Sequence, residues 1–86
     1  MPRSIIVAVR DSAANAFSRP FFVPATGMAV RSFTDEVNRN APDNPMFAHA
    51  GDFELYELGE FDEETGLFET RAPVMICRAK DVKREE

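Results

Sequence analysis

The chain has 86 residues, of which 44% are hydrophobic, and its formal net charge is −5. This length leaves room for one hydrophobic core, so we expect one domain over residues 1–80 and a charged C-terminal tail at 81–86 that frays. The acidic balance excludes binding of nucleic acid by bulk electrostatics, so any contact with phosphates needs a local basic patch.

Two features bear on the cellular compartment. Cys77 has no second cysteine in the chain with which to form a disulfide, which fits a reducing environment. The apolar run at residues 5–9 is shorter than the roughly seven residues of a signal-peptide core and the roughly twenty of a membrane span. We therefore expect a cytoplasmic protein that is neither exported nor inserted in a membrane.

The first two predicted elements are strands. Residues 4–10 form a β-branched run with apolar side chains on both faces, which is typical of a central strand. After a polar link at 11–16, the aromatic stretch 17–24 predicts a second strand. Pro20 and Pro24 each remove a backbone donor, so this strand should lie at an edge or be broken.

A single helix follows, and Thr26 is available as its N-cap. Apolar residues then recur at spacings of three and four, namely Ala29, Val30, Phe33 and Val37. The other face carries Arg31, Asp35 and Arg39 at steps of four, where the central carboxylate can meet a guanidinium one turn either way. We expect the helix to end within 38–40.

The next stretch, 40–51, contains two prolines and predicts a loop that Met46 and Phe47 pin to the core. Residues 52–61 predict a third strand, in which Gly59 marks a possible β-bulge.

A hairpin is the clearest local prediction. Its loop is 62–66, where Gly66 can adopt a positive φ, and its return strand is 67–70. A separate final strand is predicted at 74–77. The elements together predict an α+β fold, a small antiparallel sheet of four to five strands with one helix packed on one face.

One helix can cover only one face of such a sheet. The strand at 4–10 also places apolar residues, Ile6 and Ala8, on the second face. We therefore expect a homo-oligomer, preferably a dimer, that covers this second face.

No group of residues predicts an enzyme, a metal site or a cofactor site. His49 and Cys77 are the single histidine and cysteine and lie far apart in sequence. The acidic run 62–64 is too short for a calcium loop, and no nucleophile motif or glycine-rich phosphate loop is present. We expect no catalytic residue, no metal and no cofactor, and we interpret His49 as a surface or loop-anchoring residue.

The aromatic residues have two interpretations. Most phenylalanines are expected to fill the core, because the chain has no tryptophan and one tyrosine. Exposed rings beside guanidinium groups instead indicate single-stranded nucleic acid binding by base stacking. Phe21 and Phe22 are adjacent on an extended strand, so they point to opposite faces and one of them can be exposed.

Several short motifs occur in a distinctive order: RDS at 10–12, PFF at 20–22, AVRSF at 29–33, DEVN at 35–38, DFELYELGEFD at 52–62 and TGLF at 65–68. This order resembles the small non-structural protein of gokushovirus-type microviruses, bacteriophages with circular single-stranded DNA genomes. The resemblance covers residues 4–70, and the last two motifs are its most specific part.

The resemblance implies a DNA-binding protein without catalytic residues, which acts in the host cytoplasm when genome synthesis moves from duplex replication to single-stranded DNA production and packaging. With single-stranded DNA as the partner, we expect Arg19, Arg31 and Arg71 to contact phosphates. Phe22 and Tyr56 are the expected stacking residues.

The distribution of charge favours an alternative. Residues 43–69 carry nine acidic residues and no Lys or Arg, whereas residues 1–42 have a balance of +2. The alternative hypothesis is a protein-interaction adaptor that docks on the phage replication initiator, a host replication protein or the procapsid through the acidic stretch 52–69.

Overall fold

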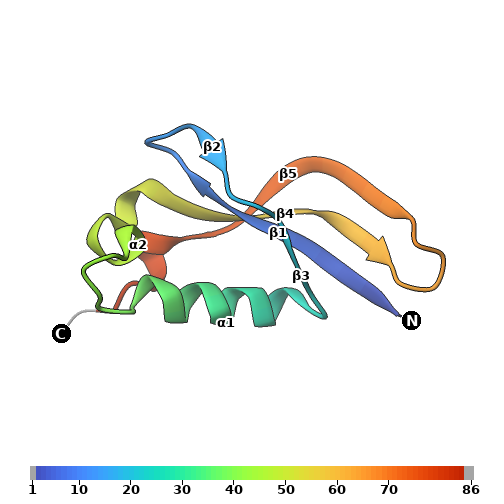
Figure 1. Ribbon diagram of the computed structural model, residues 1–86, viewed down its shortest axis with the longest axis horizontal. Helices are drawn as coiled ribbons and strands as arrows, with labels where there is room; N and C mark the ends of the chain where they lie inside the picture. The colour runs from blue at the N-terminus through green and yellow to red at the C-terminus, as the bar shows by residue number, and fades with distance from the viewer. Residues whose placement is uncertain (1, 85–86) are drawn as a thin grey trace.

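The computed structural model describes residues 2–84, which form an antiparallel sheet with a three-turn helix on one face (Figure 1). The elements are β1 (Arg3–Asp11), β2 (Ala16–Phe17), β3 (Phe21–Val23), α1 (Thr26–Val37), α2 (Pro45–Ala48), a 3₁₀ turn η1 (Ala50–Asp52), β4 (Phe53–Asp62), β5 (Phe68–Arg78) and α3 (Ala79–Val82). The sheet has five strands in the order β2-β1-β4-β5, with β3 also paired to β1. The predicted α+β class, strand number and helix position are confirmed.

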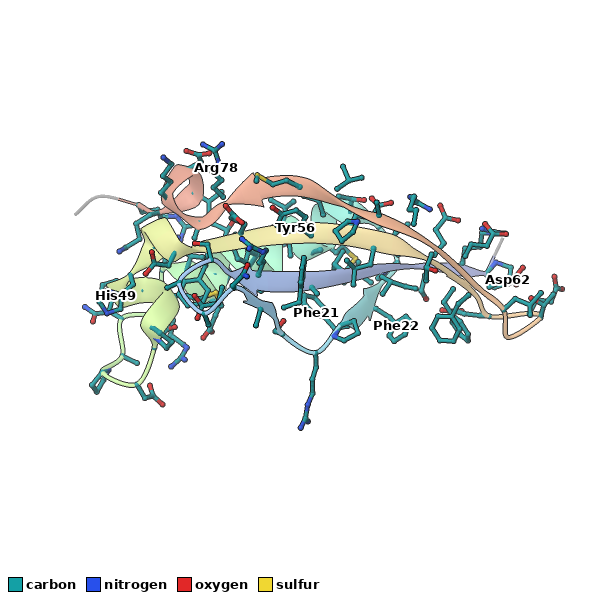
Figure 2. The ribbon with its side chains drawn as sticks, turned by 90° about the horizontal axis from the view of Figure 1, so that it is seen from above. Phe21, Phe22, His49, Tyr56, Asp62 and Arg78 are labelled. Atoms are coloured by element: carbon teal, nitrogen blue, oxygen red, sulfur yellow. The ribbon has the colours of Figure 1, made fainter. Side chains whose placement is uncertain are left out.

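Strand β1 lies in the middle of the sheet, as its apolar residues on both faces predict. It pairs with β4 along its whole length on one side and with β2 and β3 on the other. Figure 2 shows β5, β4 and β1 running side by side. The second predicted strand is both broken and at the edge, because Pro20 lies between β2 and β3.

Helix α1 begins at Thr26, so the prediction of Thr26 as N-cap is wrong. The N-cap is Ala25, which is still extended, and no side chain caps this end. The predicted pairing of Arg39 with Asp35 is also wrong, since Arg39 binds Glu36 at 2.8 Å. The helix ends before Arg39, so the i, i+4 geometry does not reach it.

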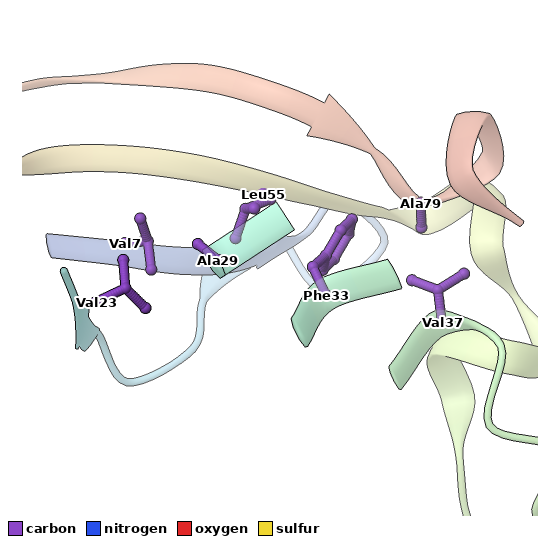
Figure 3. Close-up of a cluster of buried hydrophobic side chains, with 7 residues drawn as sticks. All are labelled: Val7, Val23, Ala29, Phe33, Val37, Leu55 and Ala79. Atoms are coloured by element: carbon purple, nitrogen blue, oxygen red, sulfur yellow. The ribbon is translucent and has the colours of Figure 1, made fainter. Parts of the chain in front are cut away.

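The hydrophobic core lies between α1 and the sheet (Figure 3). Its buried members are Val7, Val23, Ala29, Phe33, Val37, Leu55 and Ala79. Three of them come from α1 at spacings of four, which confirms the apolar stripe predicted for this helix. None of the helices within residues 2–84 is long and apolar enough to cross a membrane.

The loop predicted at 40–51 contains the short turns α2 and η1. Asn44 is buried and accepts a hydrogen bond from the backbone N–H of Met46, which caps α2. Its amide also donates to the carbonyls of Glu36 and Arg39, each at 2.8 Å. Met46 packs against the core as predicted.

Gly59 forms the predicted β-bulge. Ile6 pairs with Gly59, but the next residue, Val7, pairs with Glu57, so Leu58 is an extra residue on β4. Gly59 has a φ of +149°, and a Cβ built on it would lie 2.2 Å from the carbonyl oxygen of Glu69. No other residue type fits this position without moving the β5 backbone.

Strand β5 is continuous from Phe68 to Arg78, so the prediction of two separate strands at 67–70 and 74–77 is wrong. Gly59 pairs with Thr70 and Glu57 pairs with Val74, which leaves residues 71–73 as an outward bulge that accommodates Pro73. In the preceding hairpin loop, Gly66 has a φ of +78°, which confirms its predicted role.

The C-terminal segment is not a frayed tail over residues 81–84, contrary to the prediction. Asn38 donates to the Val82 carbonyl at 3.0 Å. The Lys83 ammonium donates to the Phe47 carbonyl at 2.8 Å and lies 4.1 Å from the centre of the Phe47 ring. These contacts tie the segment to α1 and α2. Residues 85–86 of the predicted tail lie outside the described residues.

The bulge yields a prediction about stability. Gly59→Ala should lower the free energy of unfolding by about 2 to 4 kcal/mol, because the new Cβ meets backbone and the φ is unfavourable for L residues. Gly27→Ala is the matched control, since nothing lies within 4 Å of its Cβ. The free energy of unfolding of Gly27→Ala should rise by up to about 1 kcal/mol, because alanine has a higher helix propensity than glycine. Urea denaturation of both variants checks this, and equal stabilities would contradict it.

Candidate nucleic-acid interface

The face of the sheet opposite α1 carries a row of aromatic rings. Val7 and Leu55 are fully buried under α1, so the alternating residues Ile6, Ala8 and Tyr56 point to the other face, which we call the open face. Paired residues share a face, which adds Phe22 opposite Ile6, Phe17 opposite Arg10, Phe61 opposite Ser4, and Phe68 opposite Phe61. Figure 2 looks onto this face, with α1 behind the sheet.

The five rings form two clusters. Phe17 and Tyr56 meet edge to face with centroids 5.3 Å apart. In the second cluster, Phe61 lies 5.6 Å from Phe22 and 4.8 Å from Phe68. Phe17, Phe22 and Phe68 are 43%, 48% and 59% exposed, so each cluster offers at least one ring to solvent.

The rings also bury the centre of the open face. Ile6 and Ala8 are 4% and 0% exposed, although neither belongs to the core beneath α1. Their cross-strand partners include Phe22 and Tyr56. The open face is therefore a second apolar layer whose outer surface is aromatic.

The Gly59 bulge explains why both clusters lie on one face. Tyr56 and Phe61 are five residues apart, which on a regular strand would place them on opposite faces. The extra residue, Leu58, shifts the alternation by one, and Phe61 returns to the face of Tyr56.

Two arginines and one glutamate lie at the β2 end of the open face. Arg10 lies 3.5 Å from Glu54, and the Tyr56 hydroxyl donates to Glu54 at 3.3 Å. Arg78 pairs with Glu54 across β4 and β5, so it shares this face. It is exposed and has no ion pair among the described residues. The β2 end of the open face therefore has a small positive balance within an acidic chain.

Three glutamates of the β4–β5 hairpin, Glu57, Glu60 and Glu69, point to the opposite side and meet two other arginines. Glu63 instead accepts a hydrogen bond from Ser4 on the open face. Arg3 hydrogen-bonds to Glu60 and, at 3.2 Å, to Glu69. Arg71 pairs with Glu57. Hydrogen bonding to Arg3 holds the pKa of Glu69 below its ordinary value, and Glu69 and Glu60 in turn raise the pKa of Arg3.

The hairpin loop is ordered by Asp62. Its carboxylate accepts from the backbone N–H groups of Glu64 at 2.9 Å and Thr65 at 3.2 Å. These two hydrogen bonds lower the pKa of Asp62, and nearby Arg3 adds to the effect. The carboxylate thus acts as a structural acceptor in the turn.

The predicted site residues fall in three places. Phe22 and Tyr56 share the open face, one in each ring cluster, while Phe21 packs against the core as its adjacent position predicted. Arg19 lies in the exposed segment between β2 and β3. Arg31 is exposed on α1 and so lies on the other side of the sheet, and Arg71 is paired with acidic residues there.

Sequence reasoning missed four residues of this surface: Phe17, Phe61, Phe68 and Arg78. Phe17 and Phe61 lie within the predicted strands 17–24 and 52–61, but the face to which each ring points depends on register. Counting the Gly59 bulge into the alternation of β4 would have placed Phe61 beside the face of Tyr56. Nothing local identifies Arg78, whose face follows from its pairing with Glu54.

The described residues contain no other candidate catalytic or metal-binding site. No pocket and no metal-binding group of His, Cys, Asp or Glu is found in residues 2–84. His49 is exposed on the turn after α2, as expected for a surface residue. Burial raises the pKa of the half-buried Cys77 thiol, which disfavours the reactive thiolate.

The chain is similar to a known protein family. A family model described as "Phage ORF5 protein" matches residues 4–82, which is nearly the whole chain. No curated protein and no solved structure matches the chain.

The depressed carboxyl pKa values predict acid sensitivity. A group whose pKa is lower in the folded state stabilises the fold above its unfolded pKa, about 4, and the stabilisation is lost as pH falls through the folded value. Glu36, Asp62 and Glu69 are such groups, so the unfolding temperature should fall below about pH 4.5. Arg3→Ala should make this fall shallower, because Glu69 loses its main partner.

Circular dichroism melts from pH 7 to pH 3 measure this effect. Arg19→Ala is the control, because Arg19 is exposed and has no ion pair within residues 2–84. Arg19→Ala should follow the wild-type pH profile. Identical profiles for Arg3→Ala and the wild type would contradict the assignment.

Proposed function

The chain belongs to the Phage ORF5 protein family, and on this premise we propose that it is a phage non-structural protein that binds single-stranded DNA on its open face. It acts in the host cytoplasm, during genome replication or its switch to packaging, and catalyses no reaction. Within the phages we propose the gokushovirus-type microviruses as its source, supported by the motifs at 52–62 and 65–68.

The exposed rings of the open face carry this proposal. Single-stranded nucleic acid binds where bases stack on aromatic side chains, each worth about 1 to 3 kcal/mol. An antiparallel sheet that presents aromatics on the face away from its helices is a recurring platform for two or three unstacked bases. Phe22, Phe68 and the Phe17–Tyr56 pair supply rings in this arrangement.

The charge pattern supports the same face. Arg78, which has no ion pair within residues 2–84, can meet a phosphate at the β5 edge, and Arg10 lies beside the Phe17–Tyr56 cluster. Three of the glutamates that would repel a phosphate backbone, Glu57, Glu60 and Glu69, bind Arg3 and Arg71 on the opposite side. The local charge around the rings is therefore compatible with single-stranded DNA despite the net charge of −5.

The adaptor hypothesis relies on the acidic stretch 52–69. Five of its acidic residues already pair with arginines of the same chain, so they are less available to a basic partner: Glu54, Glu57, Glu60, Asp62 and Glu69. We therefore prefer DNA as the partner, with a replication protein or procapsid as the alternative.

Fluorescence anisotropy with a labelled oligothymidine at about 50 mM salt tests the proposal. Binding should weaken with salt at a log-log slope of about −0.7 per phosphate contact. Phe68→Ala should weaken it by about 5- to 150-fold, the equivalent of one lost stacking contact. Leu67→Ala is the matched control, because Leu67 is 65% exposed beside Phe68 but is not aromatic. Absence of binding, or equal losses in both variants, would refute the proposal.

A second comparison locates the phosphate contacts. Arg78→Ala should weaken binding and reduce the salt slope by about 0.7, the value of one contact. Arg31→Ala should leave both unchanged, because Arg31 is equally exposed but lies on α1, across the sheet from the rings. Weaker binding by Arg31→Ala, with unchanged binding by Arg78→Ala, would indicate that the DNA binds on the face covered by α1.

A further inference from the structure

Strand β5 is an edge strand with an unusually exposed surface. It is paired only with β4, and eight consecutive residues, 68–75, are exposed. Three of them are large and apolar: Phe68, Val74 and Met75 are 59%, 56% and 38% exposed. Soluble proteins usually protect such an edge by charge, by proline or by a partner strand.

The sequence of β5 is that of a strand with neighbours on both sides. Residues 74–77, Val-Met-Ile-Cys, carry no charge. Val74 and Met75 are exposed and point to opposite faces, whereas Ile76 and Cys77 both pack against the core. Runs that are apolar on both faces are typical of central strands, as in β1. Two irregularities interrupt this edge, the 71–73 bulge that holds Pro73 and one extra residue at Ile76.

The two ends of β5 carry opposite charge. At the hairpin end, residues 60–71 and the adjoining Arg3 comprise five acidic residues and two arginines, a balance of −3. At the α3 end, residues 78–84 comprise four basic residues and one aspartate, a balance of +3, and the two glutamates at 85–86 lie outside the described residues. The long axis of the molecule is 44 Å, and the two ends lie far apart along it (Figure 1).

We propose that β5 is the interface for a second copy of this chain, which pairs antiparallel with it about a two-fold axis. Antiparallel pairing brings the acidic hairpin end of each copy beside the basic α3 end of the other. The same surface serves both copies, as a two-fold contact requires. Charge complementarity and the apolar middle of the strand thus favour a second copy over an unrelated peptide.

This pairing has a consequence for the open face. A two-fold axis between antiparallel edge strands is perpendicular to the sheet, so both helices lie on one side and both aromatic faces on the other. The dimer would therefore double the surface available to one DNA strand. This consequence rests on the proposed function, whereas the dimer itself does not.

Light scattering after gel filtration, without DNA, tests the interface. The wild type should have twice the monomer mass of 9.7 kDa at tens of micromolar. Val74→Glu should be monomeric, because it places a charge in the apolar edge near the two-fold axis. Met28→Glu is the matched control: Met28 is 55% exposed on α1, and this variant should remain dimeric.

Each other outcome overturns the proposal. A monomeric wild type does so directly, and so does a Val74→Glu variant that is folded and dimeric. A dimer lost in Phe22→Lys but kept in Val74→Glu would place the second copy on the open face instead. If Val74→Glu does not fold, Val74→Ser takes its place, and a folded Val74→Ser variant that dimerises as tightly as the wild type contradicts the β5 interface.

Discussion

The close approach of Gly59 to the β5 backbone is the constraint on which the two faces of this sheet depend. With no Cβ at this position, β4 can insert one extra residue and still pair with Thr70. The insertion reverses the alternation of side chains beyond it. Phe61 consequently joins the aromatic face of Tyr56, while Glu60 joins Arg3 on the other side. A single backbone contact thus decides which face of the hairpin receives Phe61 and which receives Glu60.

The sheet has two apolar faces and one helix to cover them. Beneath α1 the burial is complete, and Val7, Ala29 and Val37 have no exposed surface. On the open face, Ile6 and Ala8 are buried by rings that remain partly exposed themselves. Pairs of rings at these distances contribute about 0.5 to 1.5 kcal/mol beyond their buried area. The aromatic layer therefore stabilises the sheet and at the same time leaves ring surface for a ligand.

Local signals were sufficient for most of the fold. The spacing of Ala29, Phe33 and Val37 placed the helix, Pro20 placed the break between β2 and β3, and Gly66 placed the hairpin turn. Each of these features depends on neighbours within a few residues. The continuity of β5 did not follow, because Pro73 suggests an end to the strand, and only pairing with β4 shows that the strand bulges and resumes.

The site was less predictable because it depends on register. Phe22 could be identified from its alternation with Phe21, but the face of Phe61 or Phe68 requires knowing where β4 and β5 bulge. The arginines were harder still. The sequence indicates no partner for Arg71, yet in the fold Arg71 binds Glu57. Arg78 lies on the face of the rings because it is opposite Glu54 in the register of β4 and β5. Long charged side chains find their partners through tertiary structure, which sequence spacing does not encode.

Net charge is a poor guide to the partner of a molecule with this shape. Electrostatic interactions in solution are screened over about 8 to 10 Å at physiological salt, and the molecule is 44 Å long. A phosphate near Arg78 and α3 is therefore several screening lengths from the acidic hairpin loop at the other end. It responds to the local positive balance and to the rings beside it. Three of the glutamates that oppose nucleic-acid binding in the sequence as a whole, Glu57, Glu60 and Glu69, bind arginines on the face opposite the rings.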